Sequence, residues 1–134
     1  MQPISIAVIS LHVLAAMFWA GTSFTLARTG GLGGAQLFRP QMGAATVAIL
    51  AGGCIWQVSH AGAFDTAERV LALGAVCAII AASVQGAIGG RAIKGLRNGT
   101  ADAAGAQRRI ALAQRVAAGL LAVTAVCMVT ARYL

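Results

Sequence analysis

Apolar residues fill four long segments of the chain, which are residues 4–27, 41–61, 68–90 and 110–131. Charged residues are almost absent from them. The first two segments have none, the third has only Glu68 and Arg69 at its start, and the fourth has only Arg115. Each segment reaches the roughly 20 residues that an α-helix needs to cross about 30 Å of hydrocarbon. No stretch shows the period of two typical of membrane barrel strands. The pattern therefore predicts an all-α fold, a polytopic membrane four-helix bundle.

The segments between these spans predict short connections within a single transmembrane domain, residues 1–134. The first apolar run is too long for a signal-peptide core and has no positive residues before it, so we expect it to remain as the first helix. Asp65 and Glu68 have the spacing of an N-cap and an N3 residue for the third helix. The glycine-rich loop at residues 29–34 lacks a preceding strand and a closing Lys-Ser/Thr, which argues against a phosphate-binding loop.

Composition excludes an ordinary soluble domain. Of the 134 residues, 59% are hydrophobic and only 10% are charged, whereas soluble domains carry about 25% charged residues. A net charge of +7, from 10 Lys and Arg against three acids, could indicate nucleic-acid binding. The basic residues lie between apolar segments, however, as in membrane proteins whose positive loops set the topology. We therefore expect the lipid bilayer as the partner and no nucleic acid.

The distribution of positive charge predicts the orientation. The connections after the first and third helices carry seven positive residues: Arg28, Arg39, Arg91, Lys94, Arg97, Arg108 and Arg109. The opposite side carries only Arg69 and Arg132. By the positive-inside rule both termini lie on the outer side, which is the periplasmic side of the inner membrane if the chain is bacterial. The positive connections should also attract anionic lipid headgroups.

Small residues recur along one face of the predicted third helix, at Gly74, Ala78, Ala82, Gly86 and Gly90. Such a line allows another helix to approach closely. It predicts either packing within the chain or a homodimer or larger membrane complex. Two further stripes are expected to face the interior, namely Ser5, Ile9, His12, Ala16, Trp19 and Ser23 on the first helix and Thr46, Ile49, Gly53, Trp56 and His60 on the second.

Two histidines, His12 and His60, lie in the outer half of the predicted spans. Imidazole is a common haem ligand, so the pair suggests a b-type haem between helices near the outer face. Trp19 and Trp56 could flank the porphyrin. Both histidines must lie at nearly the same depth to share one iron, yet they differ by about 10 Å if the second helix ends near residue 61. A second helix that continues to Phe64 would roughly halve this difference, so the geometry permits the pair without favouring it. A structural histidine bonded to a neighbouring carbonyl, or an interfacial anchor at residue 60, is the alternative.

Outer positive residues and the sulfur atoms supply further candidate ligands. Arg69 and Arg132 could pair with haem propionates. A copper site is the alternative to haem, because soft sulfur and imidazole suit Cu(I). It would use His12 with Cys77 and Met128. Cys54, Cys77 and Cys127 lie on three different helices and form no Cys-x-x-Cys motif, so they can equally be structural thiols.

Residues 11–21 read Leu-His-Val-Leu-Ala-Ala-Met-Phe-Trp-Ala-Gly. This stretch resembles the Leu-His-x6-Trp-x-Gly opening of a group of small membrane proteins, which includes the copper-resistance protein D family and the bacterial membrane-integral, haem-binding protoporphyrinogen oxidases. The resemblance implies a four-helix membrane protein in which His12 is functional and Trp19 and Gly21 flank it. Porphyrin oxidation is implied by the resemblance alone, because the predicted third and fourth helices contain no Lys or His.

Three functions remain open. The first is a b-haem protein that carries electrons or forms the haem-bearing membrane subunit of a redox complex. Its second ligand would be His60, or a residue from another copy or subunit. The second is a transporter or metal-handling protein, and the third is a cofactor-free accessory subunit. An electron carrier or membrane subunit is favoured over a stand-alone enzyme, since no hydrolytic triad can be assembled from two histidines at these positions.

Overall fold

The computed structural model describes residues 2–59, 62 and 64–134, and in these residues it is all-helical. The elements are α1 (Pro3–Arg28), α2 (Gly34–Ser59), α3 (Thr66–Val84), a π-helical turn η1 (Gln85–Gly89), α4 (Gly90–Arg97) and α5 (Ala103–Ala131). Because α3, η1 and α4 are continuous, four helices are long and apolar enough to cross a membrane. The predicted all-α membrane four-helix fold is therefore confirmed, and the chain is an integral membrane protein by the length and composition of its helices.

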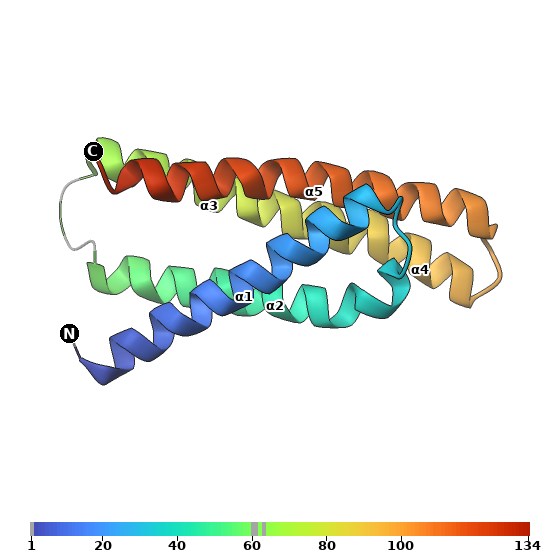
Figure 1. The fold of residues 1–134 in the computed structure, drawn as a ribbon, viewed down its shortest axis with the longest axis horizontal. Coiled ribbons are helices and arrows are strands. Elements are labelled where there is room, and N and C mark those ends of the chain that lie inside the picture. Colours follow the sequence, from blue (N-terminus) through green and yellow to red (C-terminus); the bar gives the residue numbers. More distant parts are fainter. Residues whose placement is uncertain (1, 60–61, 63) are drawn as a thin grey trace.

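The helices run alternately up and down as two hairpins, one made by α1 and α2 and the other by α3 to α5 (Figure 1). Both termini lie at one end of the bundle, which we call the terminal end, together with the end of α2 and the start of α3. The connections at residues 29–33 and 98–102 lie at the other end, which we call the arginine-rich end. Which end faces the cytoplasm stays a prediction.

The helices extend beyond the predicted spans at the arginine-rich end. There α2 begins at Gly34 and contains Pro40, α4 continues to Arg97, and α5 begins at Ala103. The positive residues mark where the apolar span ends, but a helix can continue past that boundary because its hydrogen bonds are internal. Asp102 caps α5 by accepting a bond of 3.2 Å from the backbone N–H of Gly105.

At the terminal end the predicted cap of the third helix is confirmed. The Asp65 carboxylate accepts the backbone N–H of Glu68 at 2.9 Å and is the N-cap of α3. This bond satisfies one of the N–H groups that a helix start leaves without an intrahelical partner.

The core of the bundle is built mainly from alanine. Its central cluster combines Trp19 and Leu121 with five buried alanines: Ala45, Ala48, Ala78, Ala81 and Ala117. Small side chains let the helix backbones approach closely, which favours dispersion contacts and interhelical hydrogen bonds where no water drives association.

The predicted interior stripe is correct for part of α1 and only partly correct for α2. Trp19 and Ser23 are buried as expected, but Thr46 and Gly53 are exposed. The buried face of α2 consists instead of Gln41 and the alanines at positions 45, 48 and 51. Thr46 can face lipid because its hydroxyl donates to the carbonyl of Met42 in its own helix, at 2.9 Å.

The line of small residues on the third helix lies against other helices of the same chain. A Cβ atom on Gly74 would come within 3.0 Å of Cys127 Cβ on α5, and Ala78 belongs to the core cluster. Farther along, Gly86 faces Met42 and Gly90 faces Phe38, both on α2. These contacts favour the packing alternative, and a homodimer through this face stays a prediction.

Candidate functional site

His12 lies where α1 packs against α2. Its ring Nδ1 is 2.8 Å from the backbone carbonyl oxygen of Ala48. A carbonyl only accepts hydrogen bonds, so this contact places the proton on Nδ1 and leaves the lone pair on Nε2. Gly52 makes the close approach possible, since a Cβ there would be only 3.1 Å from His12 Cε1. The half-buried imidazole is thereby held in one tautomer and one orientation.

This arrangement has two chemical interpretations. Metal-bound histidines usually donate their second ring N–H to a carbonyl or carboxylate, which orients the ring for ligation through the other nitrogen. A histidine with a purely structural role would make the same bond, since the carbonyl satisfies its polar N–H in an apolar setting. The contact fits both interpretations, and a role of His12 as a metal or haem ligand stays a prediction.

The predicted partner of His12, His60, lies outside the described residues. The His12 ring lies beside Ala48 and Gly52 of α2. Ser59, the last residue of α2, is seven positions beyond Gly52, which is about 10 Å at 1.5 Å per residue. A shared iron would require both ligands within about 2 Å of one level. Ser59 therefore lies about 10 Å from the level of the His12 ring, and the pairing of His12 with His60 stays a prediction.

Trp19 lies about two turns from His12 along α1, and its indole points into a different environment. The Nε1–H group donates to the side-chain oxygen of Gln85 at 2.6 Å, and the residue is 2% exposed. Gln85 opens the π-helical turn η1. The indole thus joins α1 to the third membrane-spanning helix rather than lying beside the His12 ring.

A closed set of polar side chains surrounds this contact. We call it the glutamine cluster; its members are Trp19, Thr22 and Ser23 of α1, Gln41 of α2, Gln85 of η1 and Gln114 of α5. The three glutamines are 0%, 1% and 3% exposed in that order. Every membrane-spanning helix contributes to the cluster, so it connects all four.

The hydrogen bonds of the glutamine cluster run from one helix to the next. Gln85 Nε2 donates to Ser23 Oγ at 2.8 Å and to Gln114 Oε1 at 2.9 Å. Gln114 Nε2 donates to Gln41 Oε1 at 2.9 Å, and Gln41 Nε2 donates back to Gln114 Oε1 at 3.1 Å. Ser23 completes the set by donating to the Trp19 carbonyl at 2.8 Å. The cluster contains no ionisable side chain, so its chemistry is structural and not that of a proton relay.

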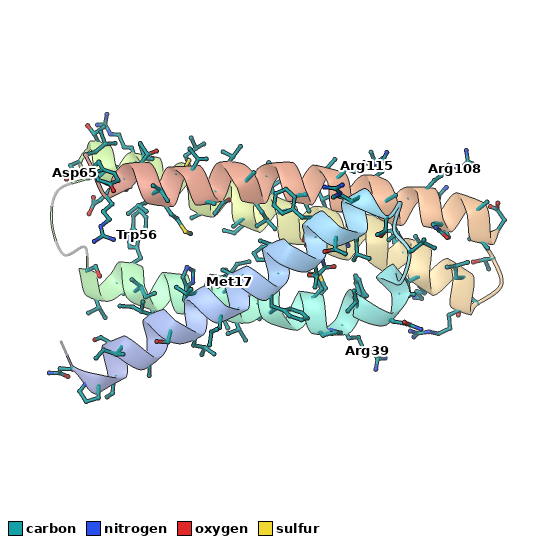
Figure 2. The ribbon with its side chains drawn as sticks, viewed as in Figure 1. Met17, Arg39, Trp56, Asp65, Arg108 and Arg115 are labelled. Carbon is teal, nitrogen blue, oxygen red and sulfur yellow. The ribbon has the colours of Figure 1, made fainter. Side chains whose placement is uncertain are left out.

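The remaining predicted haem contacts lie toward the terminal end. Trp56 is half-buried and projects from α2 toward the α3–α5 hairpin (Figure 2). Its ring is 6.4 Å from that of Phe64, centroid to centroid. Arg69 near the start of α3 and Arg132 just after α5 are both exposed. These three residues are at the same end of the bundle, whereas Trp19 is not.

The thiols do not gather into a cluster within the described chain. Cys54 is exposed, Cys77 and Cys127 are buried, and all three are free. Met128 is 40% exposed, so it lies on the outer surface of α5. Among residues 2–59, 62 and 64–134, no three His, Cys, Asp or Glu side chains lie close enough to hold a metal ion together.

The distribution of charged residues along the sequence does not predict the glutamine cluster. Each glutamine is uncharged and sits in a segment whose hydropathy is otherwise high, so counting charges passes over it. The available signal is an amide side chain inside an apolar span, which must find a hydrogen-bonding partner on another helix.

Comparisons of the chain with protein-family models, with curated proteins and with solved structures gave no match.

Proposed function

We propose that this protein binds a b-type haem in the membrane and serves as an electron carrier or as the haem-bearing subunit of a redox complex. One observation carries the proposal, which is the contact of 2.8 Å between His12 Nδ1 and the Ala48 carbonyl. It leaves Nε2 as the free ligand atom, and a backbone acceptor on Nδ1 raises the basicity of a ligating imidazole. The resemblance of residues 11–21 to haem-binding membrane proteins points to the same histidine.

The chain would supply orientation and an apolar surrounding, while the haem would supply a one-electron iron couple when bound. His12 would hold the iron, and Ala48 and Gly52 would fix the angle of its ring. Trp56 would contact the apolar porphyrin edge. Arg69 and Arg132, exposed at the terminal end, would pair with the propionate carboxylates through charge-assisted hydrogen bonds.

A haem iron held by His12 would take a second protein ligand. The 10 Å step along α2 from Gly52 to Ser59, about seven residues long, disfavours a ligand from the end of α2. We therefore propose that the second ligand comes from another copy of the chain or from a partner subunit.

The test is the absorption spectrum of the protein purified in mild detergent, before and after addition of haemin. We expect a Soret band that is lost in His12→Ala, partly restored when imidazole is added to that variant, and retained in His60→Ala. Imidazole rescue separates a lost ligand from a misfolded protein. Protein that is colourless and gains no band with haemin would end the haem proposal, and a band unchanged in His12→Ala would end the assignment of the ligand.

A cofactor-free accessory subunit is the second candidate. The glutamine cluster favours this candidate, because its buried polar side chains bond to one another and join the four helices. In that case the purified protein contains neither haem nor copper by elemental analysis, and it co-purifies with a larger membrane complex. Copper without haem would instead support the metal-handling alternative, with His12, Cys77 and Met128 as the ligands to test.

A further inference from the structure

A groove of about 430 Å³ opens at the arginine-rich end, where the turn after α1 meets the first turns of α5. Its lining residues are Gly30, Ala104, Gln107, Arg108, Ala111 and Arg115. The turn is held against α5 because Gln107 Nε2 donates to the Gly30 carbonyl at 3.3 Å. The turn can approach α5 this closely because residue 31 is glycine. Its φ is +85°, and a Cβ atom there would lie only 3.1 Å from the backbone nitrogen of Ala111.

The chemistry of the groove is that of an anion site beside an apolar wall. Arg108 and Arg115 are seven residues apart, so they lie on one face of α5, about 10 Å apart along its axis. Figure 2 shows both along α5 at the arginine-rich side of the bundle. Neither has an ion-pair or hydrogen-bonding partner in the described part of the chain. The nearest acid in sequence, Asp102, is used as the cap of α5.

The groove places an apolar lining beside the two arginines. Arg115 lies within the apolar span of α5 and Arg108 lies just before it, so the groove extends from the headgroup layer into the edge of the hydrocarbon. A free phosphate and a lipid phosphate could contact the same arginines, but only a lipid would also cover the apolar lining at Gly30, Ala104 and Ala111. The glycine turn does not itself cradle a phosphate, because the Gly31 N–H already bonds to the Leu26 carbonyl at 2.8 Å.

We propose that this groove binds the phosphate headgroup of an anionic glycerophospholipid from the surrounding bilayer. Arg108 and Arg115 hold the phosphate through charge-assisted hydrogen bonds, and Gln107 borders it. Gly30, Ala104 and Ala111 contact the glycerol and the upper acyl chain. This site is independent of the His12 region, which lies about two helical turns beyond Trp19 toward the terminal end.

The test measures lipid retention by native mass spectrometry on the delipidated full-length protein, with phosphatidylglycerol and phosphatidylcholine of the same acyl chains as the probes. We expect phosphatidylglycerol to bind with a defined stoichiometry and to bind about 30-fold more weakly to Arg108→Gln/Arg115→Gln, given about 1 kcal/mol for each arginine. The matched control, Arg39→Gln/Arg97→Gln, removes the same charge at the same end but outside the groove. Because Arg39 and Arg97 do not line the groove, they make no direct bond to the phosphate, and this variant should lose clearly less affinity than the groove variant.

Three results would overturn the proposal. Equal losses in the two double variants would mean that the attraction is diffuse, and equal binding of phosphatidylcholine would mean that the anion is not recognised. Displacement of phosphatidylglycerol by millimolar inorganic phosphate would mean that the groove holds a free phosphate and not a lipid. Arg108→Lys/Arg115→Lys keeps the charge and should retain most of the binding, which guards against loss of binding through misfolding alone.

Discussion

The interior of this bundle is organised by a few uncharged polar side chains. Gln85 makes three hydrogen bonds in the glutamine cluster, to Trp19, Ser23 and Gln114, at 2.6–2.9 Å. Hydrogen bonds between membrane helices contribute about 0.6 kcal/mol on average, and up to about 1.7. Removing one partner also leaves buried groups unsatisfied, which adds a desolvation penalty.

We therefore predict that Gln85→Leu lowers the free energy of unfolding in detergent by about 1–3 kcal/mol. The Trp19 N–H loses its acceptor, so Trp19 fluorescence, recorded in a Trp56→Phe background, should also change. The control is Gln57→Leu, the same substitution at an exposed position of α2, with an expected change within about 0.5 kcal/mol. Equal stabilities of the two variants would show that the cluster does not hold the helices together.

Between elements, α3 packs closely against α5 at Gly74, where an added Cβ would lie 3.0 Å from Cys127 Cβ. Thr124 strengthens this contact by donating its hydroxyl to the Gly74 carbonyl at 2.9 Å. Glycine is required there by the neighbouring helix and not by its own backbone angles, because α3 is regular at this position. Because this contact lies within one chain, it favours a packing role for the small residues of α3 over a dimer face.

Replacing Gly74 by Leu should destabilise the monomer by about 1–3 kcal/mol, because a larger side chain forces α3 and α5 apart. The matched variant is Gly119→Leu on α5, where a Cβ meets nothing within 4 Å. That change should be neutral or slightly stabilising, since leucine favours the helix more than glycine does. The readout is thermal unfolding together with chemical cross-linking. Loss of cross-linked dimer at unchanged monomer stability would show instead that this line is a dimer face.

At the scale of the whole molecule, positive charge is gathered at one end of the bundle. The seven positive residues within about two helical turns of the connections at the arginine-rich end are Arg28, Arg39, Arg91, Lys94, Arg97, Arg108 and Arg109. Arg69 and Arg132 lie at the terminal end. The positive-inside rule then predicts one orientation, with both termini outside.

This orientation can be measured in cells with single cysteines in a background from which Cys54, Cys77 and Cys127 have been removed. A membrane-impermeant maleimide should label Gln2→Cys and Leu134→Cys in intact cells. It should label Leu32→Cys and Asn98→Cys only after permeabilisation. The reverse pattern would place the arginine-rich end outside and contradict the topology.

The number of helices, their alternation, the cap at Asp65 and the separation of charge between the two ends could all be predicted from the sequence. These properties follow from local patterns, because hydrocarbon excludes charge and a span needs about 20 apolar residues. The sequence also singled out His12, by the cost of an ionisable group in an apolar span.

Which helix faces pack against each other depends on the tertiary structure. The partner of His12 is a backbone carbonyl 36 positions away, and that of Trp19 is a glutamine 66 positions away. Neither pairing is contained in a local pattern, because it depends on the rotation and register of one helix against another. The rotation of α2 turns Gln41 inward while Thr46 faces out. In a bundle of alanine and glycine, many registers are sterically possible, and the few hydrogen-bonding side chains select among them.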